Sequence, residues 1–164
     1  MASGKPVTAP DDTSELFTLG PATINQMRDQ SLSLLDEHYD ELATDKDVMR
    51  LSPNWKKYYE LEERDMIAGL GAWLGSEMVG YSMNLVFQHL HYQDLKVLQN
   101  DVLFVAKNHR DGGVGLKLIE ATEELGRVHE CDMILWHSKV GTALGVILER
   151  RGYKVQDVIQ SKAL

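Results

Sequence analysis

Cysteine is nearly absent from this chain of 164 residues, and long apolar runs are missing altogether. The single cysteine, Cys131, has no partner for an internal disulfide, and no metal-ligand spacing surrounds it. No stretch approaches the roughly 18 apolar residues of a membrane span, and residues 1–12 lack the apolar core of a signal peptide. We therefore expect a protein of the reducing cytoplasm, with no membrane partner and no bound metal.

Positive charge is also scarce. Lys and Arg number 17 against 25 Asp and Glu, so the formal net charge is −8 at pH 7. Proteins that bind nucleic acid usually carry a basic face, so this balance argues against nucleic acid as a partner. The same charge fits an amine-bearing substrate, although it also serves plain solubility.

The remaining composition is that of a globular protein. Hydrophobic residues make up 43% of the chain and charged residues 26%, which argues against disorder. Residues 1–13 are polar and contain two prolines, and they are predicted to form a flexible tail. Residues 14–164 are long enough for a single domain with one substantial core.

The hydrophobic pattern predicts a mixed order of strands and helices. The expected strands cover residues 15–19, 67–74, 78–87, 95–105, 133–136 and 153–159. The expected helices cover residues 21–39, with Pro21 in the first turn, a segment after Pro53, residues 116–128 and residues 142–151. The strand over 95–105 is expected to be irregular near Gln99–Asn100, where a ligand would enter. This order predicts an α+β fold with helices flanking a mostly antiparallel sheet.

A glycine-rich turn is the most informative feature of the chain. The apolar segment Val102–Val105 predicts a buried strand, and residues 111–115 (Asp-Gly-Gly-Val-Gly) then open a helix. The N–H groups at a helix start lack intrahelical partners and attract anions, so the turn predicts a phosphate or pyrophosphate site. The spacing fits neither the dinucleotide fingerprint nor the nucleoside-triphosphate loop. A structural turn with no ligand remains the alternative.

The segment Arg110–Gly115 matches the pattern Arg/Gln-x-x-Gly-x-Gly/Ala and resembles the acyl-coenzyme A loop of the GNAT superfamily of N-acetyltransferases. Element order and spacing over Asp101–Tyr153 resemble that family too, and the whole chain looks like the short GNAT proteins of bacteriophage genomes. The resemblance implies acetyl-CoA as co-substrate, a sheet whose central strands splay apart after Phe104, and a possible homodimer. The implied cofactor-binding residues are Leu103, Phe104, Val105, Arg110, Asp111, Gly112, Gly113, Val114, Gly115, Leu116 and Lys117.

Three positions depart from the family pattern. Asp111 stands where glycine is common, so its carboxylate should turn away from bound phosphates. Leu148 stands where the family often carries a tyrosine as general acid for the departing thiolate. The short C-terminal helix commonly starts near an asparagine, whereas residues 138–141 read Ser-Lys-Val-Gly.

The predicted catalytic residues are Asp101 and Tyr92. Asp101 stands at the strand position where some members of the family carry a glutamate. As a general base, Asp101 would take the proton of the attacking amine. A strand-end carboxylate facing solvent is the alternative. Tyr92 is a candidate acid. The neighbouring pair His89 and His91 faces one side of a strand but lacks a third metal ligand.

Acid-rich helix faces beside tyrosines (Asp36–Glu41 and Glu60–Asp65) would suit an ammonium group, or are simply solvated. The predicted function is acetyl-CoA-dependent transfer of an acetyl group to an amine of a small molecule or protein. The alternative is a GNAT-fold acyl-CoA-binding regulatory or interaction protein with little or no turnover.

Overall fold

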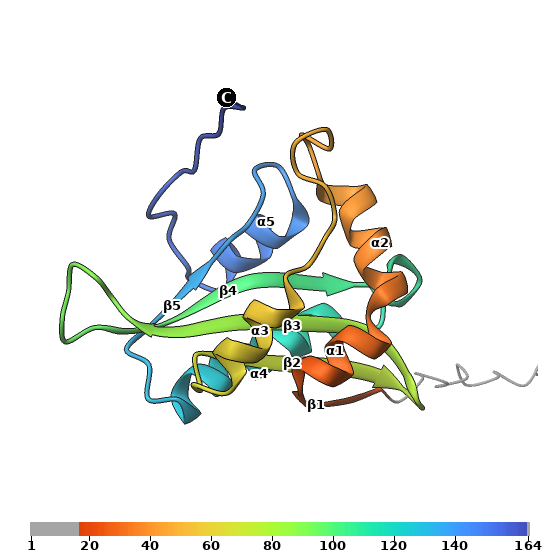
Figure 1. Ribbon diagram of the computed structural model, residues 1–164, viewed down its shortest axis with the longest axis horizontal. Helices are drawn as coiled ribbons and strands as arrows, with labels where there is room; N and C mark the ends of the chain where they lie inside the picture. The colour runs from red at the N-terminus through yellow and green to blue at the C-terminus, as the bar shows by residue number, and fades with distance from the viewer. Residues whose placement is uncertain (1–16, 164) are drawn as a thin grey trace, which may run out of the picture.

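The computed structural model describes residues 17–163, so the predicted N-terminal tail (residues 1–13) lies outside the described residues. One five-stranded sheet is flanked by helices on both faces, which confirms the predicted α+β class (Figure 1). The strands are β1 (Thr18–Ala22), β2 (Ile67–Leu74), β3 (Glu77–Gln88), β4 (Lys96–Val105) and β5 (Met133–Trp136). The helices are α1 (Ile24–Gln30), α2 (Leu32–Leu42), α3 (Trp55–Glu62), α4 (Val114–Val128) and α5 (Ala143–Arg150), with a 3-10 turn over Lys107–His109. Within this part of the chain no helix is long and apolar enough to cross a membrane.

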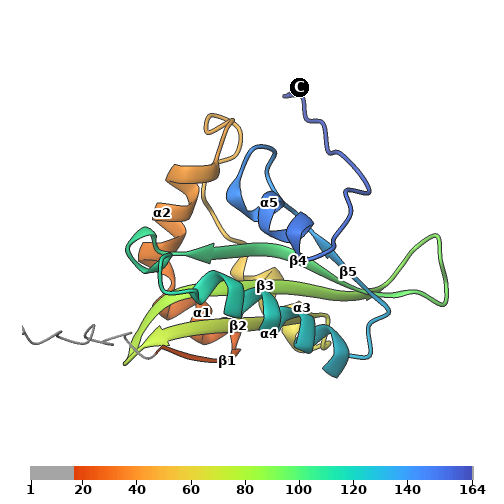
Figure 2. The same cartoon turned by 180° about the vertical axis from the view of Figure 1, so that it is seen from behind.

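The strands lie in sequence order. Strands β1 to β4 pair antiparallel, and β5 is added parallel to β4 after the crossover through α4. Helix α4 covers the face seen in Figure 2, while α1 and α3 cover the face seen in Figure 1. The hairpin predicted over residues 67–87 is confirmed as β2–β3, with Gly75 in the left-handed conformation (φ +59°).

The core has two parts because the sheet is covered on both sides. On the α1–α3 face, Tyr81 and Phe104 pack with Ile24. On the α4 face, Val79 and Val105 pack with Leu118 and other residues of a second cluster. Strand β3 contributes to both parts and is buried over most of its length. Val79 and Tyr81 face opposite sides although they are two positions apart, because the register with β2 shifts at Val79.

The predicted first helix is wrong in its details. Pro21 lies within β1 and pairs with Leu70, and the helix begins only at Ile24. Thr23 determines this start because its hydroxyl accepts the N–H of Gln26 at 3.2 Å while the Gln26 side chain accepts the N–H of Thr23 at 2.9 Å. A break at Ser31, whose hydroxyl donates to the Met27 carbonyl, then divides the segment into α1 and α2.

The strand predicted over residues 153–159 is also wrong. The chain leaves α5 at Gly152 in the left-handed conformation (φ +90°), as its position after the helix predicts, and then runs without regular structure. Val155 and Ile159 are 89% and 78% exposed, and the segment leads away from the sheet in Figure 1. The alternating pattern favoured a strand, but no neighbouring strand pairs with it. For the same reason β5 is only partly buried, and Met133 is 39% exposed.

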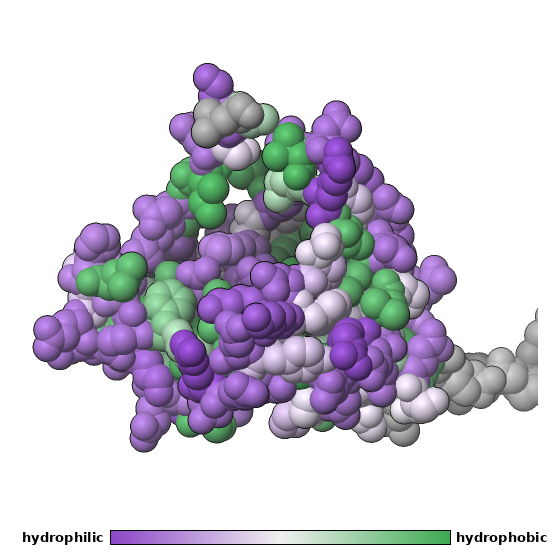
Figure 3. Space-filling view, in the orientation of Figure 1, coloured by the Kyte–Doolittle hydropathy of each residue, from purple (hydrophilic) through white to green (hydrophobic). Residues whose placement is uncertain are grey.

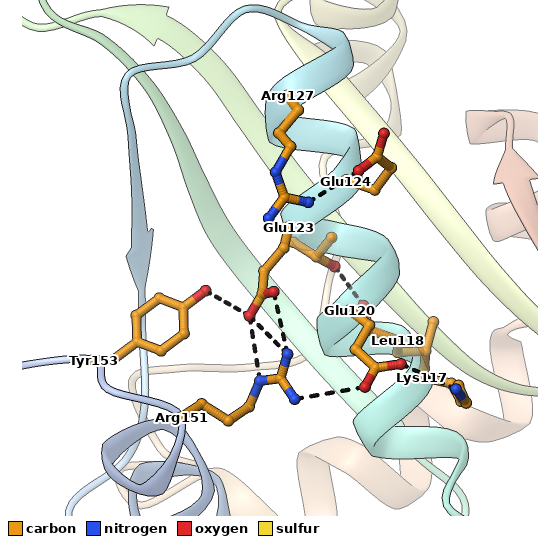
Figure 4. Close-up of polar contacts among 9 residues, drawn as sticks. Lys117, Leu118, Glu120, Glu123, Glu124, Arg127, Arg151 and Tyr153 are labelled. Carbon is orange, nitrogen blue, oxygen red and sulfur yellow. Dashed lines mark hydrogen bonds and ion pairs between the residues drawn. The ribbon is translucent and has the colours of Figure 1, made fainter.

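The end of α5 is held against α4 by a polar network (Figure 4). The Arg151 guanidinium donates to both carboxylate oxygens of Glu123 at 3.1 Å and lies 3.6 Å from Glu120. The Tyr153 hydroxyl donates to Glu123 at 3.1 Å. These contacts hold the turn after α5 beside α4.

Candidate functional site

Strands β4 and β5 separate halfway along the sheet. They pair from Val97 with Met133 to Asn100 with Trp136, and β4 then continues alone to Val105. The Ala106 N–H donates to the Val79 carbonyl of β3, so the alternation of a strand turns the backbone groups of Leu103 and Val105 to the opposite, open edge. The predicted splaying of the central strands is therefore confirmed, although the Val105 carbonyl on this edge accepts from Arg110. The separation begins at Asp101 rather than after Phe104, because β5 ends at Trp136.

A bulge in β4 marks the same point. Met83 pairs with Val102 and Asn84 with Asn100, so Asp101 is an extra residue without a partner on β3. This confirms the irregularity predicted near Gln99–Asn100. Asn100 is fully buried, and its Nδ2 lies 3.1 Å from the Val102 carbonyl and 3.3 Å from that of Met83. The Asn100 amide therefore bridges the bulge and holds Asp101 out of the ladder.

The glycine turn leads directly into α4. Gly113 precedes the helix with φ +76°, a conformation that disfavours any side chain. Along α4, Lys117 is the first residue whose N–H donates to a carbonyl of the turn, that of Gly113 at 3.1 Å. The N–H groups of Val114, Gly115 and Leu116 therefore lie in the first helical turn, where the helix itself offers no acceptor. This is the arrangement in which a helix start binds an anion.

The side chain of Arg110 points away from the glycine turn. Its Nε donates to the Val105 carbonyl at 2.9 Å, and its two terminal nitrogens donate to the Glu41 carboxylate at 3.0 and 2.8 Å. The guanidinium also lies 5.3 Å from the centre of the Phe104 ring and lowers the pKa of Glu41. Arg110 thus links the loop between β4 and α4 to both β4 and α2. Asp111 is exposed, and Lys117 pairs with Glu120 at 3.1 Å.

The predicted acid-rich faces bind this chain's own groups. On α2, Glu37 accepts the backbone N–H of Lys107 at 3.0 Å, and Asp40 pairs with Lys46 at 2.8 Å. Beside α3, Glu62 accepts the N–H of Ile24 at 2.8 Å. Tertiary contacts therefore use several of the carboxylates that the sequence offered for an ammonium group.

A cleft of about 500 Å³ lies between α2, residues 43–54, α3 and strands β3 and β4. Figure 3 shows the surface hollowed between α2 and α5, with apolar side chains inside. Its apolar lining includes Met27, Leu35, Leu42, Met49, Leu51 and Trp55. Its polar lining includes Ser31, His38, Arg50, Tyr58, Tyr81 and Lys139.

Two pairs of titratable groups involve side chains of this lining, although Asp101 itself does not line the cleft. The Tyr58 hydroxyl donates to Asp101 Oδ2 at 3.4 Å, and burial together with the Asp101 charge raises the pKa of Tyr58 to about 12. His38 Nδ1 lies 2.9 Å from the Tyr81 hydroxyl, and the His38 ring stacks on Phe104 with ring centres 4.7 Å apart. Burial lowers the pKa of His38 and raises that of Tyr81, so both groups are neutral at pH 7.

The structure brings some predicted site residues together and leaves others apart. Asp101 begins the open edge of β4 and contacts Tyr58, whereas Tyr92 lies in the loop after β3 and is 62% exposed. Five strand residues, or about 17 Å, separate Asp101 from the start of β4, and Tyr92 lies beyond that start. His89 and His91 lie in the same loop, and the described residues hold no cluster arranged to bind a metal ion. Leu148 is 5% exposed and lies in α5.

Sequence reasoning missed His38 and Tyr81. Neither residue belongs to a motif, and they meet only because α2 packs across β3 and β4. The Tyr58–Asp101 contact likewise joins residues 43 positions apart. No spacing in the sequence signals either pair.

The fold is that of solved GNAT N-acetyltransferases, which confirms the predicted fold. An aminoglycoside acetyltransferase from an uncultured soil metagenomic sample matches with a TM-score of 0.69 at 18% identity, over 91% of this chain and 98% of its own. Glucosamine-6-phosphate N-acetyltransferase from Arabidopsis thaliana matches with a TM-score of 0.66 at 13% identity, over 91% and 99%. A protein described as a transcriptional regulator from Bacillus halodurans C-125 matches with a TM-score of 0.71 at 17% identity, over 91% and 100%.

The sequence itself matches no protein-family model and no curated protein. The structural matches differ in what they act on, and one is described as a regulator. A shared fold does not determine an activity, so the function has to be argued from the site.

Proposed function

We propose that this protein transfers an acetyl group from acetyl-CoA directly to an amine. The observation that supports this proposal most is the open edge of β4 over Asp101–Val105. One end of this edge leads to the glycine turn, and the other end leads to Asp101 beside the cleft. A nucleotide-bearing thioester would lie along this edge, and an amine in the cleft would reach its carbonyl.

The backbone of this chain would hold the co-substrate. The N–H groups of the glycine turn from Gly113 to Leu116 would hold the pyrophosphate, since that of Lys117 donates to the Gly113 carbonyl, and the helix dipole of α4 would add positive potential there. The open backbone groups of Leu103 and the N–H of Val105 would pair with the amides of the pantetheine arm, as an added strand does. The Val105 carbonyl already accepts from Arg110, which leaves it less available to the arm.

Asp101 would accept the proton that the attacking ammonium must lose. The Tyr58 hydroxyl, protonated because its pKa is raised, donates to this carboxylate and holds it in place. The amine nitrogen then forms a bond to the acetyl carbon, and a backbone N–H of the open edge stabilises the resulting oxyanion. The nitrogen loses its second proton to solvent, and the oxyanion collapses to the amide as the carbon–sulfur bond breaks. Leu148 has no proton to donate, so the thiolate takes its proton from solvent, and we expect modest turnover.

The first experiment is titration of the purified protein with acetyl-CoA by calorimetry, together with the variant Gly113→Glu. The variant introduces a side chain and a negative charge at the φ +76° position of the turn. Gly75→Glu is the matched control, because Gly75 also has a positive φ (+59°) and open space around it but lies in the β2–β3 turn. We expect binding by the wild type and by Gly75→Glu, and loss of binding in Gly113→Glu. Equal binding by both variants would contradict the assigned site.

A GNAT-fold acyl-CoA-binding regulatory protein is the second candidate. The buried Leu148 favours it, because it removes the hydroxyl acid that many members of the family carry at that position. Release of free thiol with amines separates the two functions. Acetyl-CoA binding with no thiol release across a panel of amines would support the regulatory protein, whereas amine-dependent release would support the enzyme.

A further inference from the structure

The cleft beside Asp101 has an unusual charge distribution for a site that takes amines. None of the described residues that line it is an aspartate or a glutamate, and its two charged lining residues, Arg50 and Lys139, are both cationic. Lys139 donates to the Leu42 carbonyl, which places its ammonium at the α2 side of the cleft. The lining side chain Tyr58 donates to the carboxylate of Asp101.

Several acids of the elements around the cleft are paired outside it, and Asp45 and Asp47 in residues 43–54 are exposed and do not line it. Glu41 binds Arg110 through both oxygens, and Asp40 binds Lys46. On α3, Glu60 lies 3.5 Å from Lys57, and Glu62 accepts a backbone N–H. These carboxylates therefore add little negative potential inside the cleft. Asp101 provides for one ammonium group, and nothing in the lining provides for a second.

The rest of the lining is apolar. Leu35, Leu42, Met49, Leu51 and Trp55 surround the space, which at about 500 Å³ holds a small molecule. Apolar side chains favour an apolar body by excluding water from both surfaces. A second ammonium placed among them would lose its hydration without a partner, and it would face Arg50 and Lys139.

We propose, building on the acetyltransferase function above, that the acceptor is a primary amine attached to a compact apolar body with no second cationic group. The amine meets Asp101, and the apolar body lies against α2 and residues 49–55. This assignment separates the chain from its structural match that acts on aminoglycosides, which are polycations. The lining thus determines acceptor choice within a fold that serves many acceptors.

The test compares hexylamine with 1,6-diaminohexane, two acceptors of equal length that differ in the second ammonium. Acetyl transfer is followed by release of free thiol at saturating acetyl-CoA, and sisomicin serves as a polycationic acceptor. We expect kcat/KM for hexylamine to exceed that for the diamine by at least about tenfold, since an unpaired ammonium in an apolar site is costly. Equal or better use of the diamine or of sisomicin would overturn the inference and leave the proposed function standing.

A pair of variants tests whether the lining is the cause. Met49→Glu puts a carboxylate into the cleft lining at a 57% exposed loop position, and Val48→Glu puts the same charge at the neighbouring, 64% exposed position outside the lining. We expect Met49→Glu to reduce the preference for hexylamine at least about threefold through attraction of the second ammonium, and Val48→Glu to leave it unchanged. The same preference in both variants would contradict a role for the lining. Absence of thiol release with every amine would instead overturn the proposed acetyltransferase function.

Discussion

Replacing Asn100 with alanine tests how the bulge in β4 is built. Asn100 is completely buried, and its Nδ2 lies within 3.3 Å of the carbonyls of Val102 and Met83. The same nitrogen lies 2.9 Å from Asn84 Oδ1 and 3.1 Å from Ser82 Oγ. An amide has only two N–H donors, so these four acceptors share two hydrogen bonds.

The expected cost follows from those bonds. Two buried hydrogen bonds are worth about 2 kcal/mol, and the carbonyls left without a donor, together with the lost volume, add about 1 kcal/mol more. We therefore expect Asn100→Ala to lower the free energy of unfolding by about 3 kcal/mol. A domain of this size has about 5–15 kcal/mol of stability, so the variant should still fold.

The assay is urea denaturation followed by circular dichroism, with thiol release measured on the same samples. Gln99→Ala is the matched control, because it truncates the adjacent, half-buried residue of β4; we expect a change within about 0.5 kcal/mol. The displaced bulge in Asn100→Ala should also lower kcat/KM by a larger factor than it lowers the affinity for acetyl-CoA. A loss below about 1 kcal/mol would refute the argument that this amide supports the bulge.

Three further substitutions test the titratable groups. Asp101→Asn should lower kcat/KM about a hundredfold at pH 7 with binding of acetyl-CoA unchanged, and the defect should shrink at higher pH as the amine loses its proton unaided; steady-state rates across pH check this. Burial lowers the pKa of His38, so its neutral form stabilises the fold above its ordinary pKa of 6.5, and that stability is lost as pH falls below 6.5 toward the lowered value. His38→Gln should therefore lose less unfolding free energy between pH 7.5 and pH 5.5 than the wild type does in urea denaturation. Arg110 lowers the pKa of Glu41, so their pair stabilises the fold above the ordinary pKa of 4.5 and this gain is lost as pH falls below that value. Glu41→Gln should cost about 0.5–1 kcal/mol at pH 7, with the difference from wild type vanishing in acid unfolding experiments.

Much of the fold was predictable because its signals are local. The hairpin β2–β3 follows from two apolar segments around a glycine turn, and α4 follows from a helical apolar pattern after Gly113. The bulge was predicted from polar residues at Gln99–Asn100 within an apolar strand. Errors arose where local preferences competed, as at Pro21, which suits both a helix start and an edge strand.

Residues 153–159 show the limit of such patterns. Their alternation favours a strand, yet a strand forms only where another strand supplies hydrogen-bond partners. The described part of the chain leaves this segment unpaired and exposed. Pairing depends on where α5 ends relative to β5, which the local sequence does not encode.

The sequence by itself determined the glycine turn, the strand before it and the helix after it, because backbone conformation there depends on residues a few positions apart. Only the tertiary structure decided which side chains meet at the site. Arg110 belongs to the motif but binds Glu41 and Val105, while His38 and Tyr58 belong to no motif but meet Tyr81 and Asp101. Such contacts arise when α2 and α3 pack onto the sheet, and they join residues dozens of positions apart.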